Sequence, residues 1–246
     1  MKKFALVLYG VFFFSCQYTA DKTAQELIDA SITYYGQNRW DQIDIHFQFR
    51  KHRYSLHRAD KQTVYTRETL HSPFLLDSLY GNGKFVRYKQ DIPQQLSDSL
   101  QQVYAASVNS VLYFFQIPRV LNDPAVIKKR LPDTWIKNKK YHQVQITFQQ
   151  EGGGADYEDE FRYWLDPETY AVDYLAYKYL TDGGGVRFRA VKNRRSKSGF
   201  VFQDYRNYKP KNSTQNLDSL PGLFNRAALL EISQIENTNL RIKSLQ

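Results

Sequence analysis

Residues 158–191 read EDEFRYWLDPETYAVDYLAYKYLTDGGGVRFRAV, and this stretch decides the predicted fold class. It is dense in Tyr, Phe, Trp and Val, which favour β-strands. Two typical turn sequences interrupt it, DPET at 166–169 and DGGG at 182–185. The stretch therefore predicts three antiparallel strands joined in a meander.

The charged residues of this meander predict which side chains share a face. The first turn is expected to place Arg162 opposite Asp173, and the glycine turn to place Tyr177 opposite Arg189. Because side chains alternate along a strand, one face becomes polar and the other apolar, and a one-residue slip in a single strand would mix them. The candidate ligand-binding residues on the polar face are Glu158, Glu160, Arg162, Trp164, Asp173, Tyr177, Tyr179, Arg187 and Arg189. The residues expected on the apolar face are Phe161, Tyr163, Leu165, Val172, Tyr174, Ala176 and Phe188.

This polar face has two interpretations. It is either a binding surface, on which Arg and Glu orient a ligand that Tyr and Trp stack against, or a solvated sheet face. In the second case its charges form ordinary cross-strand ion pairs, each worth about 0.2–1 kcal/mol. The sequence leaves both interpretations open.

The N-terminus has the pattern of a secretory signal peptide. Lys2 and Lys3 precede an uncharged, largely apolar run at 4–14, which is too short to span a bilayer as a helix. The only cysteine of the chain, Cys16, follows directly, and this arrangement resembles the lipobox of bacterial lipoproteins, although Phe13-Phe14 depart from its usual residues. The alternative is a signal peptide that is cleaved elsewhere.

The resemblance implies a signal peptide at 1–15, a lipid anchor on Cys16 and a tether at 16–22, followed by a single domain at 23–246. Several acyl chains anchor a protein stably, whereas one chain does not. Gln17 stands where Asp commonly retains lipoproteins in the inner membrane. By that resemblance, we expect an outer-membrane lipoprotein of a Gram-negative bacterium that faces the periplasm.

The remaining chain predicts further strands and two helical regions. A capping box, Thr23-x-x-Glu26, opens an expected helix that ends near Gly36. Apolar residues alternate with polar ones over 43–49, which is typical of a half-buried strand. The pattern over 93–115 predicts a long helix, and Asp123-Pro124 predicts a short helix through residue 129.

Composition and motifs exclude several classes of site. The formal net charge is +9, but secretion and the lack of a nucleic-acid-binding motif argue against nucleic acid, so an anionic membrane surface or lipid is the expected electrostatic partner. The five histidines form no zinc motif, and the sequence has neither a GxSxG elbow nor a P-loop. We therefore expect no metal, no cofactor and no nominated catalytic residue.

The order of elements resembles the LolA/LppX-like superfamily of bacterial lipoprotein carriers. The strings VLYFFQIPRVL (111–121), EDEFRYWLDPETYAVDYLAY (158–177) and GGGVRFR (183–189) are also similar to an uncharacterised family of Bacteroidetes-type lipoproteins. The superfamily resemblance implies an α+β, mainly antiparallel fold, in which a strongly curved, unclosed half-barrel sheet packs against helices that form a lid. It also implies an apolar cavity that holds acyl chains.

Three hypotheses of function follow. The first is a non-enzymatic envelope protein that binds a lipid or other amphiphile, whose polar head meets the arginines and tyrosines of the meander. The second is a scaffold that binds another envelope protein. The third is a hydrolase that uses the carboxylates of Glu160 and Asp173. For the first hypothesis, the expected cavity-lining residues are Ile43, Ile45, Phe47, Tyr163 and Tyr174.

Overall fold

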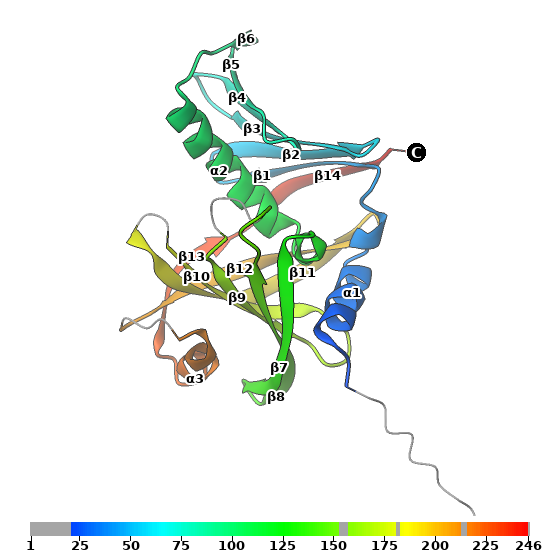
Figure 1. The fold of residues 1–246 in the computed structure, drawn as a ribbon, viewed down its shortest axis with the longest axis vertical. Helices are drawn as coiled ribbons and strands as arrows, with labels where there is room; N and C mark the ends of the chain where they lie inside the picture. The colour runs from blue at the N-terminus through cyan, green and yellow to red at the C-terminus, as the bar shows by residue number, and fades with distance from the viewer. Residues whose placement is uncertain (1–20, 153–156, 181–182, 213–215, 246) are drawn as a thin grey trace, which may run out of the picture.

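The chain folds into two antiparallel sheets with a long helix between them (Figure 1). The structure is a computed structural model that describes residues 21–152, 157–180, 183–212 and 216–245. Each sheet has seven strands, and neither closes into a barrel. The predicted fold class, mainly antiparallel strands in unclosed sheets with a few helices, is confirmed, although two sheets stand where a single curved sheet was expected.

The upper sheet in Figure 1 consists mainly of one meander from the first half of the chain. The C-terminal strand β14 returns to it and pairs with β1. In spatial order, the strands are β14 (Thr238–Ser244), β1 (Ile43–Phe49), β2 (His52–Ala59), β3 (Gln62–Thr69), β4 (Leu75–Tyr80), β5 (Phe85–Lys89) and β6 (Ile92–Pro93).

The lower sheet is a second meander, from the second half of the chain. The stretch that opened the sequence analysis forms its central strands. In spatial order, they are β13 (Leu229–Ile235), β12 (Phe200–Pro210), β11 (Gly185–Lys197), β10 (Val172–Tyr179), β9 (Glu160–Leu165), β8 (Lys139–Phe148) and β7 (Val126–Ile136).

Three α-helices pack against these sheets. The long helix α2 lies between the sheets, α1 lies beside the lower sheet, and α3 covers the opposite face of the lower sheet (Figure 1). The helices are α1 (Ala24–Tyr34), α2 (Asp98–Phe115) and α3 (Leu220–Asn225), with single 3₁₀ turns η1 (Gln37–Arg39), η2 (Arg119–Asn122) and η4 (Leu217–Ser219).

Local sequence signals explain where α1 and α2 begin. Thr23 and Glu26 form the predicted capping box, with Thr23 N–H donating to a Glu26 carboxylate oxygen at 2.7 Å. The predicted helix at 93–115 starts later than expected, because Ser97 accepts the N–H of Leu100 and caps α2 while Pro93 belongs to β6. The short helix predicted at 123–129 is wrong, since β7 begins at Val126.

The helix α2 contributes to the cores on both of its sides. Val108 and Leu112 are fully buried with the apolar residues of β1 and β2 in the upper sheet. The next two residues of the helix, Tyr113 and Phe114, pack against the core of the lower sheet. Because the C-terminal end of α2 is apolar on consecutive positions, it is covered from both sides there and joins the two sheets.

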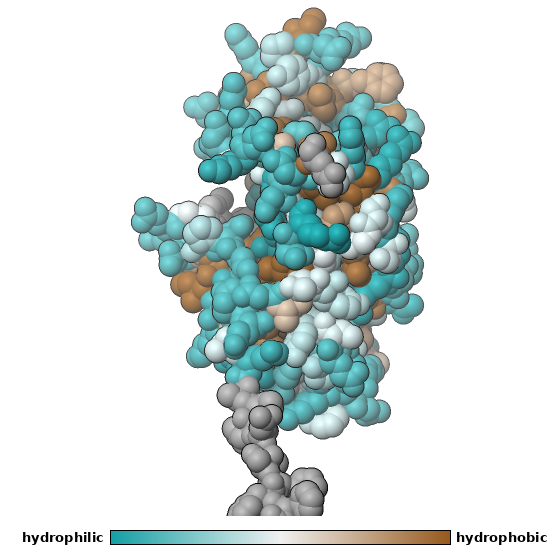
Figure 2. All heavy atoms as spheres, turned by 90° about the vertical axis from the view of Figure 1, so that its right-hand side faces the viewer, coloured by the Kyte–Doolittle hydropathy of each residue, from teal (hydrophilic) through white to brown (hydrophobic). Residues whose placement is uncertain are grey.

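Outside the cores, the surface is mainly polar. Figure 2 shows the side of the molecule on the right of Figure 1, where polar residues dominate and apolar ones gather at mid-height. Among the described residues, no helix has both the length and the apolar character needed to cross a bilayer.

We predict that Leu112→Ala lowers the free energy of unfolding by about 2–5 kcal/mol, because it opens a cavity in the core that α2 shares with the upper sheet. Urea denaturation followed by circular dichroism measures this change. The matched control is Leu100→Ala on the same helix, where the side chain is 44% exposed and the expected loss is about 0.5 kcal/mol or less. Equal losses in the two variants would contradict the packing of Leu112 in the core that α2 shares with the upper sheet.

Candidate functional site

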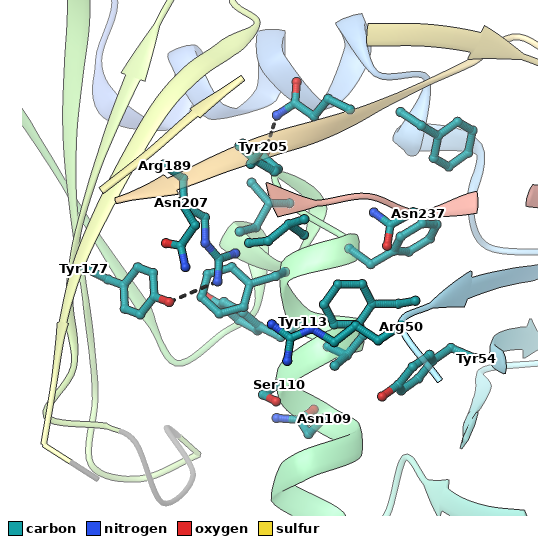
Figure 3. Close-up of a pocket in the computed structure, with 18 of the residues that line it drawn as sticks. Arg50, Tyr54, Asn109, Ser110, Tyr113, Tyr177, Arg189, Tyr205, Asn207 and Asn237 are labelled. Atoms are coloured by element: carbon teal, nitrogen blue, oxygen red, sulfur yellow. Dashed lines mark hydrogen bonds between the residues drawn. The ribbon is translucent and has the colours of Figure 1, made fainter. Parts of the chain in front are cut away.

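A cavity of about 820 Å³ lies between α2 and the two sheets. Its wall combines the C-terminal half of α2, strands β9 to β13 of the lower sheet, and the turn between β1 and β2 (Figure 3). Elements far apart in the sequence therefore surround one space, because α2 keeps the sheets apart while contacting both.

Aromatic rings form a large part of the wall. Phe114 of α2 lies 5.1 Å from Tyr177 of β10, and Tyr177 lies 5.4 Å from Phe161 of β9, both measured between ring centroids. Such contacts hold the flat apolar rings in place along the wall. The aromatic residues of the wall are Tyr35, Phe49, Tyr54, Tyr113, Phe114, Phe115, Phe148, Phe161, Tyr177, Tyr179, Phe202 and Tyr205.

Several buried tyrosine hydroxyl groups in this wall stay protonated at neutral pH. Burial raises the pKa of Tyr54, Tyr113 and Tyr205 above the ordinary value of a phenol. Burial, together with the nearby Arg67 guanidinium, lowers the pKa of His52 below its ordinary value, so that this imidazole is neutral as well. The positive charge of the wall therefore comes from arginine and lysine.

Arg189 is the most buried cation of the cavity wall, with 7% of its surface exposed. Its Nη2 donates to the hydroxyl oxygen of Tyr177 at 3.0 Å (Figure 3), and its guanidinium carbon lies 3.8 Å from the ring centroid of Phe114. Strand β10 and helix α2 therefore fix the guanidinium from two sides. Its buried Nε has no hydrogen-bond partner.

A row of polar side chains continues from Arg189 across the lower sheet. Arg189 pairs with Asn207 of β12, and Asn207 pairs with Ser233 of β13. Asn207 donates to the Ser233 hydroxyl at 3.1 Å, while its buried Oδ1 has no partner. All three residues line the cavity, so its wall offers a cation, an amide and a hydroxyl on one side.

Further cations lie on the upper-sheet side of the cavity. Arg50 and Lys51 are exposed in the turn between β1 and β2. Arg67 is committed to the buried carboxylate of Asp77, with Nη2 and Oδ2 2.6 Å apart. Asp159 of the connection before β9 also belongs to the wall. The cavity therefore has a positive balance of charge.

The predicted register of the meander is wrong in β9. Arg162 pairs with Ala176 instead of Asp173, because Leu165 pairs with Val172, two residues beyond the expected position, and a bulge between Val172 and Tyr174 adds one more residue. Phe161 and Tyr163 consequently share the cavity side with Tyr177, whereas Arg162, Glu160 and Trp164 face α3 with Tyr174, Ala176 and Phe188.

The register between β10 and β11 is also displaced, but by two residues. Tyr177 pairs with Arg187, and Leu175 with Arg189. A displacement by two leaves every side chain on its predicted face. For this reason Tyr177, Tyr179 and Arg189 come together on the cavity wall as expected, while Arg187 lies beside the Tyr179 ring outside it.

Arg162 belongs to a buried ion cluster on the opposite face. Its Nη1 lies 2.7 Å from Glu160, and its Nε lies 2.8 Å from Asp218 of η4. Hydrogen bonds to both carboxylates raise the pKa of Arg162 against the lowering effect of burial. The cluster attaches η4 to the sheet and does not reach the cavity.

The other predicted ligand-binding residues either contact other parts of the protein or lie away from the cavity. Asp173 pairs with Arg194 at 2.5 Å, Trp164 is fully buried in the core beneath α3, and Glu158 is exposed before β9. None of them belongs to the cavity wall.

None of the five residues predicted to line a cavity does so. They are buried in the cores instead: Ile43, Ile45 and Phe47 in the upper sheet, Tyr163 in the lower sheet, and Tyr174 packed against the core on the α3 side. The predicted lipidation site, Cys16, lies outside the described residues.

Sequence reasoning missed the contribution of α2 and β12 to the wall. Ser110 and Phe115 of α2, and Phe202 and Asn207 of β12, line the cavity. The string VLYFF at 111–115 indicates that α2 contacts more than one element, because a helix that is apolar on consecutive positions is covered on more than one side.

Among the described residues, no group of three or more His, Cys, Asp or Glu side chains is arranged to hold a metal ion. The cavity wall instead combines aromatic rings, a buried guanidinium and uncharged polar groups. This combination suits an apolar molecule that carries a polar group.

A comparison with models of protein families identifies the family of the chain. The model of a family of unknown function, DUF6503, matches residues 1–237. The chain belongs to this family. A comparison with curated proteins found no match.

Solved structures share the fold at low sequence identity. A DUF1329 family protein from Desulfovibrio piger is 10% identical with a TM-score of 0.53, over 89% of this chain and 92% of that one. A LolA superfamily protein from Nitrosomonas europaea is 11% identical with a TM-score of 0.50, over 92% of this chain and 96% of that one. The LolA-like fold expected from the sequence is confirmed.

We predict that Arg162→Met lowers the free energy of unfolding by about 1–3 kcal/mol, because it leaves Glu160 and Asp218 without their shared donor. Thermal and urea unfolding measure the loss. Binding of a neutral hydrophobic fluorophore to the folded variant should be unchanged, since Arg162 lies away from the cavity.

The control is Lys178→Met, which removes a 3.5 Å contact with the same Glu160 from a more exposed position. It should cost about 0.5 kcal/mol or less. Loss of fluorophore binding in folded Arg162→Met would return this residue to the ligand site.

Proposed function

We propose that the protein is a non-enzymatic envelope lipoprotein that holds the apolar part of a lipid or other amphiphile between α2 and the sheets. The observation that carries the proposal is the cavity of about 820 Å³ with its aromatic wall. Sites for small molecules typically enclose about 300–1,000 Å³ and have apolar linings with a few polar groups. The cavity matches this description in both size and lining.

The energetics favour an apolar occupant. Each methylene group that leaves water for such a wall contributes about 0.8 kcal/mol. Phe114, Phe161 and Phe202 supply apolar surface from three different elements, so that a chain in the cavity contacts protein on several sides. The likeness in fold to a LolA superfamily protein supports the proposal.

The proposal includes a membrane anchor. Residues 1–15 act as a signal peptide, Cys16 carries the acyl chains, and residues 16–22 form a tether before the domain at 23–246. The mature protein then sits on the outer membrane of a Gram-negative bacterium and faces the periplasm. Its positive charge matches an anionic bilayer surface.

The hydrolase hypothesis loses its structural basis. It required the carboxylates of Glu160 and Asp173 to act together on one polar face. Glu160 pairs with Arg162 and Lys178, and Asp173 pairs with Arg194. Each carboxylate is therefore held by its own cations away from the cavity wall.

The cavity is tested with Ser110→Trp. Ser110 lines the cavity from α2, and its side chain is exposed, so the indole ring occupies the space without disturbing the core. We expect affinity for the neutral fluorophore N-phenyl-1-naphthylamine to fall at least tenfold. Fluorescence titration measures it, and mass spectrometry of organic extracts should show less co-purifying amphiphile.

The matched control is Ala106→Trp, an equally large change on the exposed surface of the same helix that does not line the cavity. It should bind the fluorophore like the wild type. Absence of fluorophore binding in the wild type, with no amphiphile in its extracts, would contradict the proposal and favour the scaffold hypothesis.

The anchor is tested with Cys16→Ser in the full chain. Without the thiol no diacylglycerol can be attached, so we expect the protein to move from the membrane fraction to the soluble fraction. Fractionation followed by intact-mass measurement records both the location and the mass of the acyl chains. Persistence of the variant in the membrane fraction would argue against anchoring through Cys16.

A further inference from the structure

The charge of Arg189 has no ionic partner within the described part of the protein. None of the ion pairs formed by the described residues includes Arg189, although only 7% of its surface is exposed. Burying a cation without a counter-charge is costly. A bound anion would remove this cost, because it would supply the missing negative charge inside the cavity.

The guanidinium is held in position rather than left to find a partner. The Phe114 ring lies 3.8 Å from its central carbon, and the hydroxyl of Tyr177 accepts from its Nη2. A cation over an aromatic face gains about 0.5–2 kcal/mol, which fixes the group without neutralising it. The remaining N–H groups of the guanidinium can therefore donate to an acceptor in the cavity.

Other polar groups beside Arg189 fit the same ligand group. Its cross-strand neighbour Asn207 lines the cavity, and the amide nitrogen of Asn207 keeps a second N–H beyond the one that it donates to the Ser233 hydroxyl. The Tyr177 hydroxyl carries a proton of its own, which it can donate to an oxygen that also accepts from the guanidinium.

We propose that Arg189 binds the polar end of the ligand, and that this end is a singly charged oxyanion of the carboxylate class. The proposal rests on the proposed function, since it assigns the head group of the same amphiphile. A carboxylate matches the planar fork of a guanidinium through two parallel hydrogen bonds.

The charges beside Arg189 favour a head with one charge. Arg67 shares the carboxylate of Asp77 with Arg87, and the exposed Arg50 and Lys51 lie in the turn between β1 and β2 on the upper-sheet side of the cavity. Only Arg189 offers a buried cation without a carboxylate among the described residues of the wall. A doubly charged phosphate monoester would keep one charge uncompensated beside the Phe114 ring.

The test compares three ligands with the same sixteen-carbon chain: palmitate, methyl palmitate and hexadecyl phosphate. Each ligand is added to the wild-type protein at pH 7.5, below the concentration at which that ligand aggregates. The affinity is measured from the displacement of bound N-phenyl-1-naphthylamine. We expect palmitate to bind at least tenfold more tightly than its ester and more tightly than the phosphate. In Arg189→Met, palmitate and its ester should bind within about twofold of each other.

The matched control is Arg187→Met, which removes the same charge two residues away on β11 from a side chain outside the cavity wall. It should keep the wild-type preference for palmitate. Arg189→Lys should recover part of the preference, because it restores the charge without the planar fork. Circular dichroism confirms that each variant is folded.

The outcomes separate this inference from the proposed function. Equal binding of palmitate and methyl palmitate by the wild type would overturn the inference and leave the cavity as a site for neutral amphiphiles. Tighter binding of hexadecyl phosphate would overturn the assignment of a single charge. If none of the three displaces the fluorophore and the fluorophore itself does not bind, the proposed function fails as well.

Discussion

The structure depends on the packing of α2 against two sheets at once. Val108 and Leu112 fill the core of the upper sheet, and the next two residues, Tyr113 and Phe114, pack against the lower sheet. The aromatic side chains at the end of the helix pack toward both sheets, and Phe200 and Phe202 of β12 join the core of the upper sheet beside them. The space that remains is the cavity, so its size follows from the same residues that stabilise the fold.

Two arginines of the lower sheet, on strands β9 and β11 with β10 between them, show how the face of a strand decides the role of a charge. Arg162 and Arg189 are similarly buried, at 6% and 7% exposure. Arg162 faces η4, where two carboxylates surround it and make it a structural residue. Arg189 faces α2, where aromatic rings surround it and its charge stays available.

Patterns confined to one segment predicted the structure well. The capping box at Thr23 and the alternation from Ile43 to Phe49 depend on neighbours along the chain, and both appear as expected. The face of β9 depends on a bulge at Asp173, which no local pattern revealed, and one inserted residue exchanged its two faces. The cavity wall was harder still to predict, because it is assembled from α2, β10, β11 and β12 across long distances in sequence.

The return of the chain from β13 to β14 has a mechanical consequence. Only residues 236–237 separate these strands, and they join the lower sheet to the upper one. Asn237 is held there, since its N–H donates to the buried Asp204 at 3.0 Å and its carbonyl oxygen accepts from Arg195. This short link ties the two sheets together at the edge of the cavity, because Asn237 itself lines it. The amphiphile site is therefore bounded on that side by backbone that both sheets hold in place.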